Sequence, residues 1–231
     1  MTEIIPGVHK VDGIRGANAY LIADSGVTVV DTGMGDNSKA ILDAVKGLGY
    51  APGDVKHVVI THCHMDHTGS VASLREATGA KVMIGEADAD ALEGKAPQPA
   101  PKMPLPLNLI IPIARRFMKF KPSPVDVRLK DGDIIPVLGG VTVLDLPGHS
   151  PGNLGLYCPA QKLMFSGDTL RMKGDDFIEP LNYKAEKAQC LASIKKMGSV
   201  DYEIMLSGHS PPILRKASKK VAAYAEKLSG E

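Results

Sequence analysis

The sequence predicts a mixed α/β protein in which two layers of strands and helices pack sheet against sheet. The chain has 231 residues, 44% of them hydrophobic and 4% aromatic, which is enough to bury a large aliphatic core. Both halves of the chain run from short β-prone segments through a polar cluster to a helical segment. We expect one domain over residues 1–231, although two small domains would also fit this length.

The first half begins with an expected hairpin. Residues 18–22 and 27–30 are β-prone, and Asp24-Ser25-Gly26 between them favours a turn. The second strand continues directly into Asp31-Thr32-Gly33. The other elements expected in this half are a helix at 38–48, a buried strand at 57–60, a helix at 70–78 and a strand at 81–84.

Proline marks an insertion at about 94–126. Eight of the seventeen prolines lie between Pro97 and Pro124, where they disfavour sustained strands and long helices. From residue 95 to residue 125 the insertion has six basic side chains and no acidic one, and an apolar run at 105–113 lies beside Arg115, Arg116 and Lys119. We expect either a lid for an anionic or amphiphilic substrate, a membrane-surface contact through 103–121, or a packing or homodimer element.

A second series of strands follows the insertion. Turn residues separate these strands, and the chain then alternates between helix and strand to its end. The expected elements are strands at 134–138, 141–146, 154–157 and 162–165, a helix at 184–197, a strand at 203–206 and a helix at 216–228.

Charge and cysteine content exclude several classes of protein. Twenty-seven basic and twenty-six acidic residues leave a net charge of +1, so there is no strong signal for nucleic-acid binding. Three cysteines without CxxC spacing argue against a disulfide framework, and we expect reduced thiols. The start of the chain lacks a leader-like pattern and no eighteen-residue apolar run is present, so we expect a soluble, cytoplasmic protein.

The strongest functional signal is the segment His62-Cys63-His64-Met65-Asp66-His67, which has three imidazoles and one carboxylate within six residues. It follows a predicted buried strand, so one loop can direct several of these side chains inward. Imidazole nitrogen and carboxylate oxygen are the ligands of a catalytic zinc ion, and four such groups exceed what one open site needs. The spacing therefore predicts a site for two metal ions.

Three further polar residues follow a glycine at the end of a predicted strand. They are His149 after Gly148, Asp168 after Gly167 and His209 after Gly208. Asp31 also ends a strand, and we interpret it either as a buried carboxylate that fixes the ligand loop or as an ordinary turn aspartate. Thr61, directly before His62, is a second candidate for a hydrogen bond near the site.

This pattern resembles the metallo-β-lactamase superfamily, and in particular its glyoxalase II-like and lactonase-like branch. The resemblance extends from Asn18 to His209 and includes the HxHxDH segment. It implies an αββα sandwich of four layers with the ligand loops along one edge. It also implies that His62, His64 and His149 bind one metal, that Asp66, His67 and His209 bind a second, and that Asp168 bridges the two.

The resemblance also bears on the metal. Family members with glutamate in place of His64 tend to bind iron for redox work, so the histidine favours two zinc ions, while iron and manganese remain alternatives. Two metals that share one water lower its pKa and polarise the oxygen of the scissile bond, and no serine or cysteine nucleophile is then needed. Asp66 is the best candidate for a catalytic proton carrier, because it is both a ligand and a base.

The predicted function is hydrolysis of an ester, lactone, thioester or phosphodiester in a small-molecule substrate. A secreted β-lactamase is disfavoured by the start of the chain, and a type II glyoxalase by the few residues after His209. A nuclease would be expected to have a more basic surface. The non-hydrolytic alternatives are a mononuclear-iron persulfide dioxygenase, which uses fewer ligands, and a non-catalytic binding module.

Overall fold

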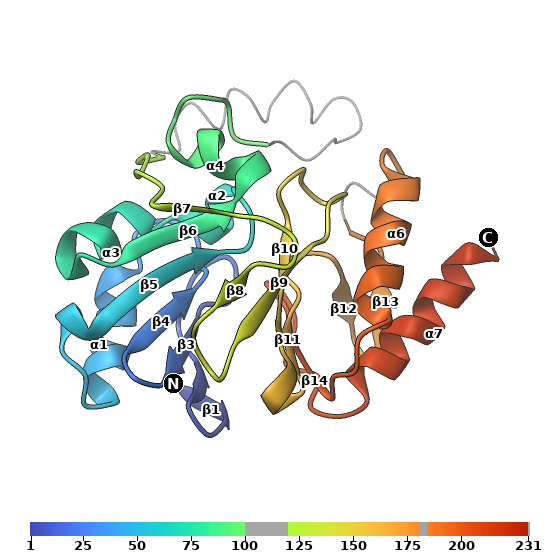
Figure 1. Cartoon of the computed structure of the whole chain (residues 1–231), viewed down its shortest axis with the longest axis horizontal. Helices are drawn as coiled ribbons and strands as arrows, with labels where there is room; N and C mark the ends of the chain where they lie inside the picture. The colour runs from blue at the N-terminus through green and yellow to red at the C-terminus, as the bar shows by residue number, and fades with distance from the viewer. Residues whose placement is uncertain (100–119, 181–183, 231) are drawn as a thin grey trace.

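The computed structural model describes residues 1–99, 120–180 and 184–230, which form two sheets packed face to face with helices on both outer faces (Figure 1). Within these residues the first sheet has the strand order β1-β2-β3-β4-β5-β6-β7 and the second has the order β14-β11-β10-β9-β8. The strands of the first sheet are β1 (Thr2–Ile5), β2 (Val8–Lys10), β3 (Tyr20–Ala23), β4 (Val27–Val30), β5 (Val55–Ile60), β6 (Lys81–Gly85) and β7 (Val127–Leu129). Those of the second are β8 (Ile134–Ile135), β9 (Val141–Asp145), β10 (Leu154–Cys158), β11 (Leu163–Phe165) and β14 (Ile204–Leu206).

The longer helices form the two outer layers. The helices α1 (Ser38–Gly47) and α3 (Val71–Thr78) pack on the first sheet, and α6 (Lys187–Gly198) and α7 (Ala217–Ser229) pack on the second. The shorter elements are α2 (Met65–Thr68), α4 (Glu86–Leu92), the 3-10 turns η1 (Pro52–Asp54) and η2 (Pro159–Gln161), and a hairpin of β12 (Arg171–Lys173) and β13 (Asp176–Ile178).

Alternation along the strands supplies three separate apolar cores. In β5, Val58 and Ile60 pack toward the helices α1 and α3, whereas Val59 packs between the two sheets. In β11, Phe165 belongs to the core between the sheets and Met164 to the core under α6 and α7. Because successive side chains of a strand point to opposite faces, a sheet buried on both sides needs such continuous apolar runs. The expected four-layer αββα arrangement is therefore confirmed.

Strand direction explains why residues far apart in sequence meet at one edge. The strands β4, β5 and β6 run parallel to one another. In the second sheet β10 is antiparallel to both β9 and β11, and β11 is parallel to β14, so β9, β11 and β14 share one direction. The carboxyl ends of parallel strands lie at the same edge of a sheet, where ligands commonly bind.

Most expected elements are present, with ends shifted by a few residues. The expected hairpin corresponds to β3 and β4, and the expected helices correspond to α1, α3, α6 and α7. The elements β1, β2, β7, α4 and the β12–β13 hairpin are not predicted from the sequence, because short elements contain too few residues to show a periodicity. No helix in the described part of the chain is long and apolar enough to cross a membrane.

The expected insertion at 94–126 lies between α4 and β7. Its central part, with Arg115, Arg116 and Lys119, falls outside the described residues, as does most of the proposed membrane-contact segment 103–121. Its two ends are described. Residues 120–126 lead into β7, and Phe120 packs against the core under α1 and α3. The roles suggested for this insertion therefore stay predictions.

Candidate metal centre

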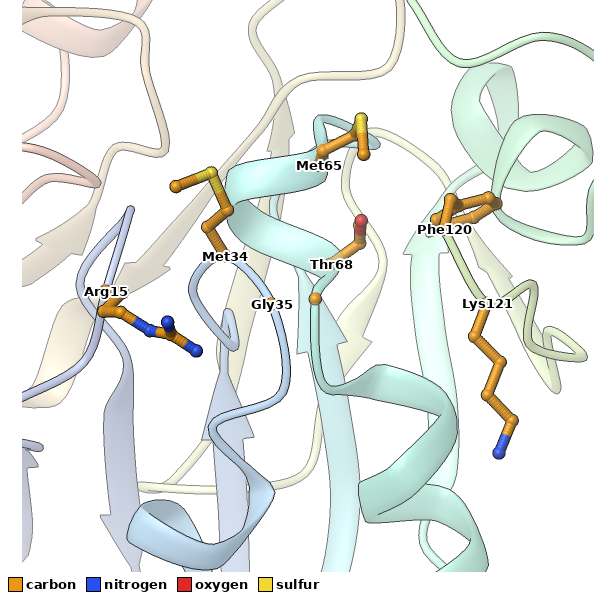
Figure 2. Close-up of a pocket in the computed structure, with 8 residues that line it drawn as sticks. Arg15, Met34, Gly35, Met65, Thr68, Phe120 and Lys121 are labelled. Carbon is orange, nitrogen blue, oxygen red and sulfur yellow. The ribbon is translucent and has the colours of Figure 1, made fainter. Parts of the chain in front are cut away.

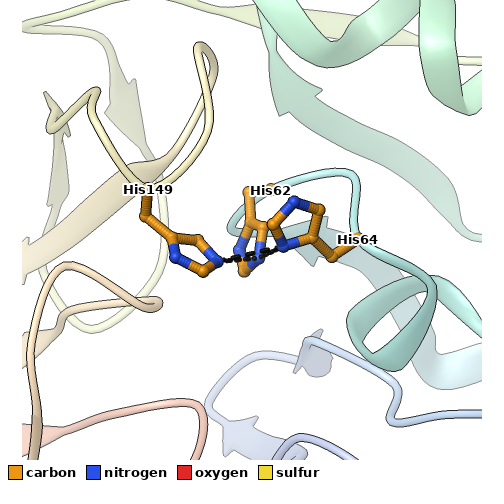
Figure 3. Close-up of side chains that lie close together, drawn as sticks. All are labelled: His62, His64 and His149. Carbon is orange, nitrogen blue, oxygen red and sulfur yellow. Dashed lines mark hydrogen bonds between the residues drawn. The ribbon is translucent and has the colours of Figure 1, made fainter. Parts of the chain in front are cut away.

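Three imidazoles converge between the two sheets. His62 and His64 follow β5, and His149 follows β9. The Nε2 atom of His62 lies 2.9 Å from Nδ1 of His64, and Nε2 of His149 lies 3.2 Å and 3.0 Å from these two atoms (Figure 3). All three side chains are buried. We call this set the buried triad.

The buried triad fits a metal ion. Zinc–nitrogen bonds of about 2.0–2.1 Å at tetrahedral angles would separate the ligand nitrogens by about 3.3 Å, close to the observed spacing. Burial, together with the neighbouring imidazoles, lowers the pKa of His62 well below its usual value and that of His64 to about 3. Burial also lowers the pKa of His149 to about 4. The three rings are thus neutral at physiological pH, as metal ligands must be.

A second set of ligand-type atoms lies beside the triad. Asp66 and His67 belong to α2, and His209 follows β14. The Oδ2 atom of Asp66 is 3.0 Å from Nε2 of His209, and one ligand atom from each of the three residues lies within 4.8 Å of the others. His67 is fully buried, whereas the side chains of Asp66 and His209 are 35% and 25% exposed. We call this set the open group.

Asp168, at the end of β11, lies between the two sets. Its Oδ2 atom is 3.5 Å from Nε2 of His149 and 3.3 Å from Nε2 of His209, and its Oδ1 atom is 3.5 Å from Nε2 of His67. Neither this Oδ1 atom nor Nε2 of His67 has a hydrogen-bond partner among the described residues, although both are buried. Their 3.5 Å contact is an ion pair without a hydrogen bond, and buried polar atoms are rarely left without one, so a metal cation between them would satisfy both.

The electrostatics of the open group also favour a cation. Burial opposes the charged form of His67, but the Asp31 and Asp168 carboxylates outweigh it and raise the pKa of His67 well above its usual value. Burial is likewise outweighed at His209, where Asp168 and Asp66 raise the pKa to about 9. Burial disfavours the charged form of Asp66 as well, yet its bond to His209 lowers the pKa of this carboxyl to about 2. The same carboxylates would stabilise a divalent ion.

Asp31 and Thr61 orient two of these rings. The Oδ2 atom of Asp31 accepts a hydrogen bond from Oγ1 of Thr61 at 2.8 Å and lies 2.8 Å from Nδ1 of His67. Since the hydroxyl proton of Thr61 points to Asp31, its oxygen can accept from Nδ1 of His62, which is 3.2 Å away. In the neutral form of each ring, which is the form that binds a metal, Nε2 is then the nitrogen without a proton and points toward the centre. Asp31 adopts a left-handed backbone with φ 55°, a conformation that aspartate tolerates better than most residues.

Comparison with known proteins agrees with this arrangement. A family model described as the metallo-beta-lactamase superfamily matches residues 12–209, from the first sheet to the last candidate ligand. The chain belongs to the metallo-beta-lactamase superfamily. The resemblance inferred from the HxHxDH segment is therefore confirmed.

Individual members of the superfamily are similar at low identity. The chain is 30% identical over 159 residues to the protein YobT of Bacillus subtilis, covering 68% of this chain and 63% of YobT. It is 27% identical over 196 residues to the hydroxyacylglutathione hydrolase of Cereibacter sphaeroides, covering 83% of this chain and 61% of that enzyme. The chain thus spans about three fifths of the length of these curated relatives.

The solved structures agree on the fold. The metallo-beta-lactamase family protein TTHA1429 of Thermus thermophilus superimposes with a TM-score of 0.75 at 22% identity, covering 99% of this chain and 80% of that one. At this identity the likeness supports the αββα fold and says nothing of the substrate.

One buried carboxylate near the centre, Asp88, is not predicted from the sequence. Asp88, in α4, is fully buried, and its Oδ2 atom accepts hydrogen bonds from the backbone N–H of Cys63 at 2.7 Å and from the hydroxyl of Ser150 at 3.2 Å. Its Oδ1 atom accepts from the N–H of Gly152 at 3.0 Å. Asp88 therefore ties the loop of His62 and His64 to the loop of His149. Its short acidic helix gave one signal, since an aspartate flanked by alanines can be buried only if its carboxylate is hydrogen-bonded.

The preceding glycines have a steric reason. A Cβ atom on Gly208 would lie 2.3 Å from Oδ1 of Asp168 and 2.6 Å from Cε1 of His67, so no side chain fits there. Gly167 has φ 50°, and a Cβ on it would lie 2.6 Å from the side chain of Asn153. The glycines let the ligand loops approach one another closely. The remaining histidines, His9 and His57, lie on β2 and β5 and belong to neither ligand set.

Proposed function

We propose that this protein is a hydrolase with two divalent metal ions, zinc in preference to iron or manganese, that cleaves a thioester, ester or lactone bond in a small molecule. The observation that carries the proposal is the position of Asp168. Its carboxylate lies within 3.5 Å of ring nitrogens from both the buried triad and the open group. A carboxylate shared by two sets of ligand-type residues suits a two-metal hydrolytic site.

The comparisons support acyl transfer to water as the reaction. A relative of similar sequence is a hydroxyacylglutathione hydrolase, and the matched region covers 83% of this chain. The donor set of imidazoles and carboxylates is the set that suits zinc. Phosphodiester hydrolysis needs the same kind of centre and is the second reaction to test, since the residues around the two sets do not distinguish the two electrophiles.

Two metal ions bound here would supply a Lewis acid for the substrate oxygen and an activated water. The side chains have separate tasks. Asp31 and Thr61 hold His62 and His67 in the tautomers that leave Nε2 free to bind. Hydrolysis adds the water oxygen to the acyl carbon and breaks the bond from that carbon to sulfur or oxygen. We assign to Asp66, which is partly exposed and 3.0 Å from His209, the transfer of the water proton to the departing group.

The burial of the two ligand sets indicates how the substrate would reach the metal centre. The buried triad is closed to solvent, whereas Asp66 and His209 are partly exposed. The substrate would therefore reach the centre from the side of the open group.

The test combines elemental analysis with a substrate panel. Protein purified without added metal should contain about two metal ions per chain, predominantly zinc, and should hydrolyse at least one member of a panel of acyl thioesters, esters, lactones and phosphodiesters. Chelation should abolish turnover and zinc should restore it. One iron per chain together with oxygen consumption in the presence of a persulfide would replace the proposal with a dioxygenase.

A further inference from the structure

A cavity outside the metal centre lies against the helix that carries Asp66 and His67. Its volume is about 260 Å³, and it is lined by Met65, Thr68 and Gly69 from α2 and its end, by Met34 and Gly35 from the loop after β4, and by Arg15, Phe120 and Lys121 (Figure 2). Met65 and Thr68 are three residues apart, so they share one face of the helical turn. Asp66 and His67 use the rest of that turn for the metal centre.

The wall of the cavity is mainly apolar. Met34 is 39% exposed and Met65 is half-buried, and the two thioethers lie across the top of α2 from one another in Figure 2. Phe120 closes the opposite side and is anchored on the core under α1 and α3. Flexible methionine side chains together with an aromatic ring suit chain-like apolar ligands, because methionine adapts its shape to the occupant. An apolar cavity of about 150 Å³ accepts benzene, so by proportion this one accepts about ten carbon atoms.

The rim of the cavity is cationic, and its two basic residues differ. Lys121 forms an ion pair with Glu76 at 3.1 Å, and its amine points away from the cavity toward α3. The guanidinium of Arg15 extends over Gly35, where a Cβ atom would lie 3.3 Å from its terminal nitrogen. Within the described residues no carboxylate lies within ion-pair distance of Arg15, and no acidic residue lines the cavity. The guanidinium of Arg15 could therefore pair with an anionic ligand without first breaking an ion pair.

We propose that this cavity binds an amphiphilic small molecule whose apolar chain lies between Met34, Met65 and Phe120 and whose anionic group pairs with Arg15. The chain of the proposed substrate and a separate fatty-acid-like effector share this chemistry. The site itself does not depend on the proposed hydrolase activity, because its evidence is the cavity, its apolar wall and the unpaired cation.

Binding can be measured without any assay of catalysis. In protein carrying ¹³C-methyl methionine, titration with octanoate should shift the methyl signals of Met34 and Met65. The signals of Met197 and Met205, which are buried in the core under α6 and α7, should stay in place. Acetate, which has the charge without the chain, should shift neither pair at the same concentrations. The same titration with octanol measures the contribution of the chain alone.

Two variants separate the charge from the chain. Arg15→Met should weaken octanoate binding by roughly tenfold and leave octanol binding unchanged, since a charge-assisted contact is lost. Met34→Glu should weaken both ligands, because it places a carboxylate in the apolar wall. Lys39→Met, which removes an exposed lysine paired with Asp43 on α1, is the matched control and should bind like the wild type. Thermal melts of all variants check that each is folded.

The outcomes are decisive. The proposal is overturned if octanoate leaves the Met34 and Met65 methyls unshifted at millimolar concentration, or if Arg15→Met and Lys39→Met bind octanoate equally. Where binding is found, inhibition kinetics identify the source of the ligand. Competitive inhibition of the hydrolysis of an acyl substrate indicates the substrate chain, and a change in kcat at saturating substrate indicates an effector. A hydrolase assay that fails while the methyl shifts persist would refute the proposed function and leave this site standing.

Discussion

The buried triad and the open group share the Asp168 carboxylate but differ in burial and in charge. The imidazoles of His62, His64 and His149 are closed to solvent and have pKa values lowered by burial. In the open group, Asp66 and His209 are partly exposed and neighbouring carboxylates raise the pKa of His209 to about 9. The triad is therefore suited to hold a metal ion, and the open group is suited to receive the substrate.

The two sets are also held in place by different carboxylates. Asp31 bonds directly to His67 of the open group and reaches His62 of the triad only through Thr61, whereas Asp88 ties together the two loops beside the triad. Each carboxylate is buried and fully engaged in hydrogen bonds. Outer residues of this kind usually affect metal affinity by about ten- to a hundredfold. The buried triad and the open group can therefore be tested separately.

The largest effect is expected where the two sets meet. Asp168→Ala should release at least one metal ion per chain and lower turnover by about a hundredfold or more, because it removes the group that both sets share. Elemental analysis and initial rates measure both. Asp175→Ala, at an exposed carboxylate between β12 and β13, is the control and should retain full activity. Wild-type activity in Asp168→Ala would contradict the arrangement proposed for the centre.

Next in size is the contrast between single-ligand variants. His149→Ala should abolish binding of the more tightly held metal, since it opens a shielded set of three neutral imidazoles. His209→Ala should keep one metal ion and lose mainly turnover, because the triad remains whole. Metal content after gel filtration and stepwise zinc affinities measure the difference. Equal metal loss in both variants would show that the two sets are not distinct.

The metal affinities of the two sets should also depend differently on pH. His67 and His209 both have raised pKa values, that of His209 to about 9, so a metal must displace a proton from each ring, and affinity at the open group should rise by roughly tenfold to a hundredfold per pH unit from pH 6 to pH 9. His64 and His149, with pKa values of about 3 and 4, are already unprotonated over this range. Zinc competition against a chelator at pH 6, 7.5 and 9 should give one affinity that changes steeply and one that changes little. If both zinc affinities change equally with pH, the two sets do not differ in protonation.

Replacing Asp88 or Asp31, the two carboxylates that orient the ligands, should have smaller effects on metal affinity. Asp88→Asn presents an amide nitrogen to one of three hydrogen-bond donors and should weaken metal binding at the triad by about tenfold. Asp31→Asn should have a similar effect at the open group through His67, and a smaller one at the triad through Thr61 and His62. Stepwise zinc affinities of both variants, with thermal melts to confirm folding, provide the measurement. If Asp31→Asn weakens the metal of the triad as much as that of the open group, the assignment of Asp31 to the open group is wrong.

The smallest effect is expected at Cys63, between two candidate ligands. Its side chain is fully buried in the core under α1 and α3 and does not face the metal centre. Cys63→Ser should therefore keep at least about half of the activity, while burial of a hydroxyl lowers the free energy of unfolding by about 1 kcal/mol. Rates at saturating zinc and a denaturant titration check both values. A loss as large as that of His64→Ala would make the thiol part of the reaction.

Sequence alone determined the chemistry of the centre and the order of most elements. Three imidazoles and a carboxylate within six residues predict a metal site without knowledge of the fold, because residues so near in sequence are also near in space. Long helices and buried strands were likewise readable, because each contains enough residues to show a period. The glycines before His149, Asp168 and His209 were visible, and their steric role follows only from the packed loops.

Tertiary structure decided what distant residues do together. His149, Asp168 and His209 meet because β9, β11 and β14 run in one direction, and strand direction is a property of sheet pairing that no local pattern encodes. The role of Asp88 and the cavity beside α2 depend on contacts between segments up to about one hundred residues apart. Such contacts arise from burial of apolar faces on both sides of two sheets, so their partners are selected by packing and not by neighbouring residues in the chain.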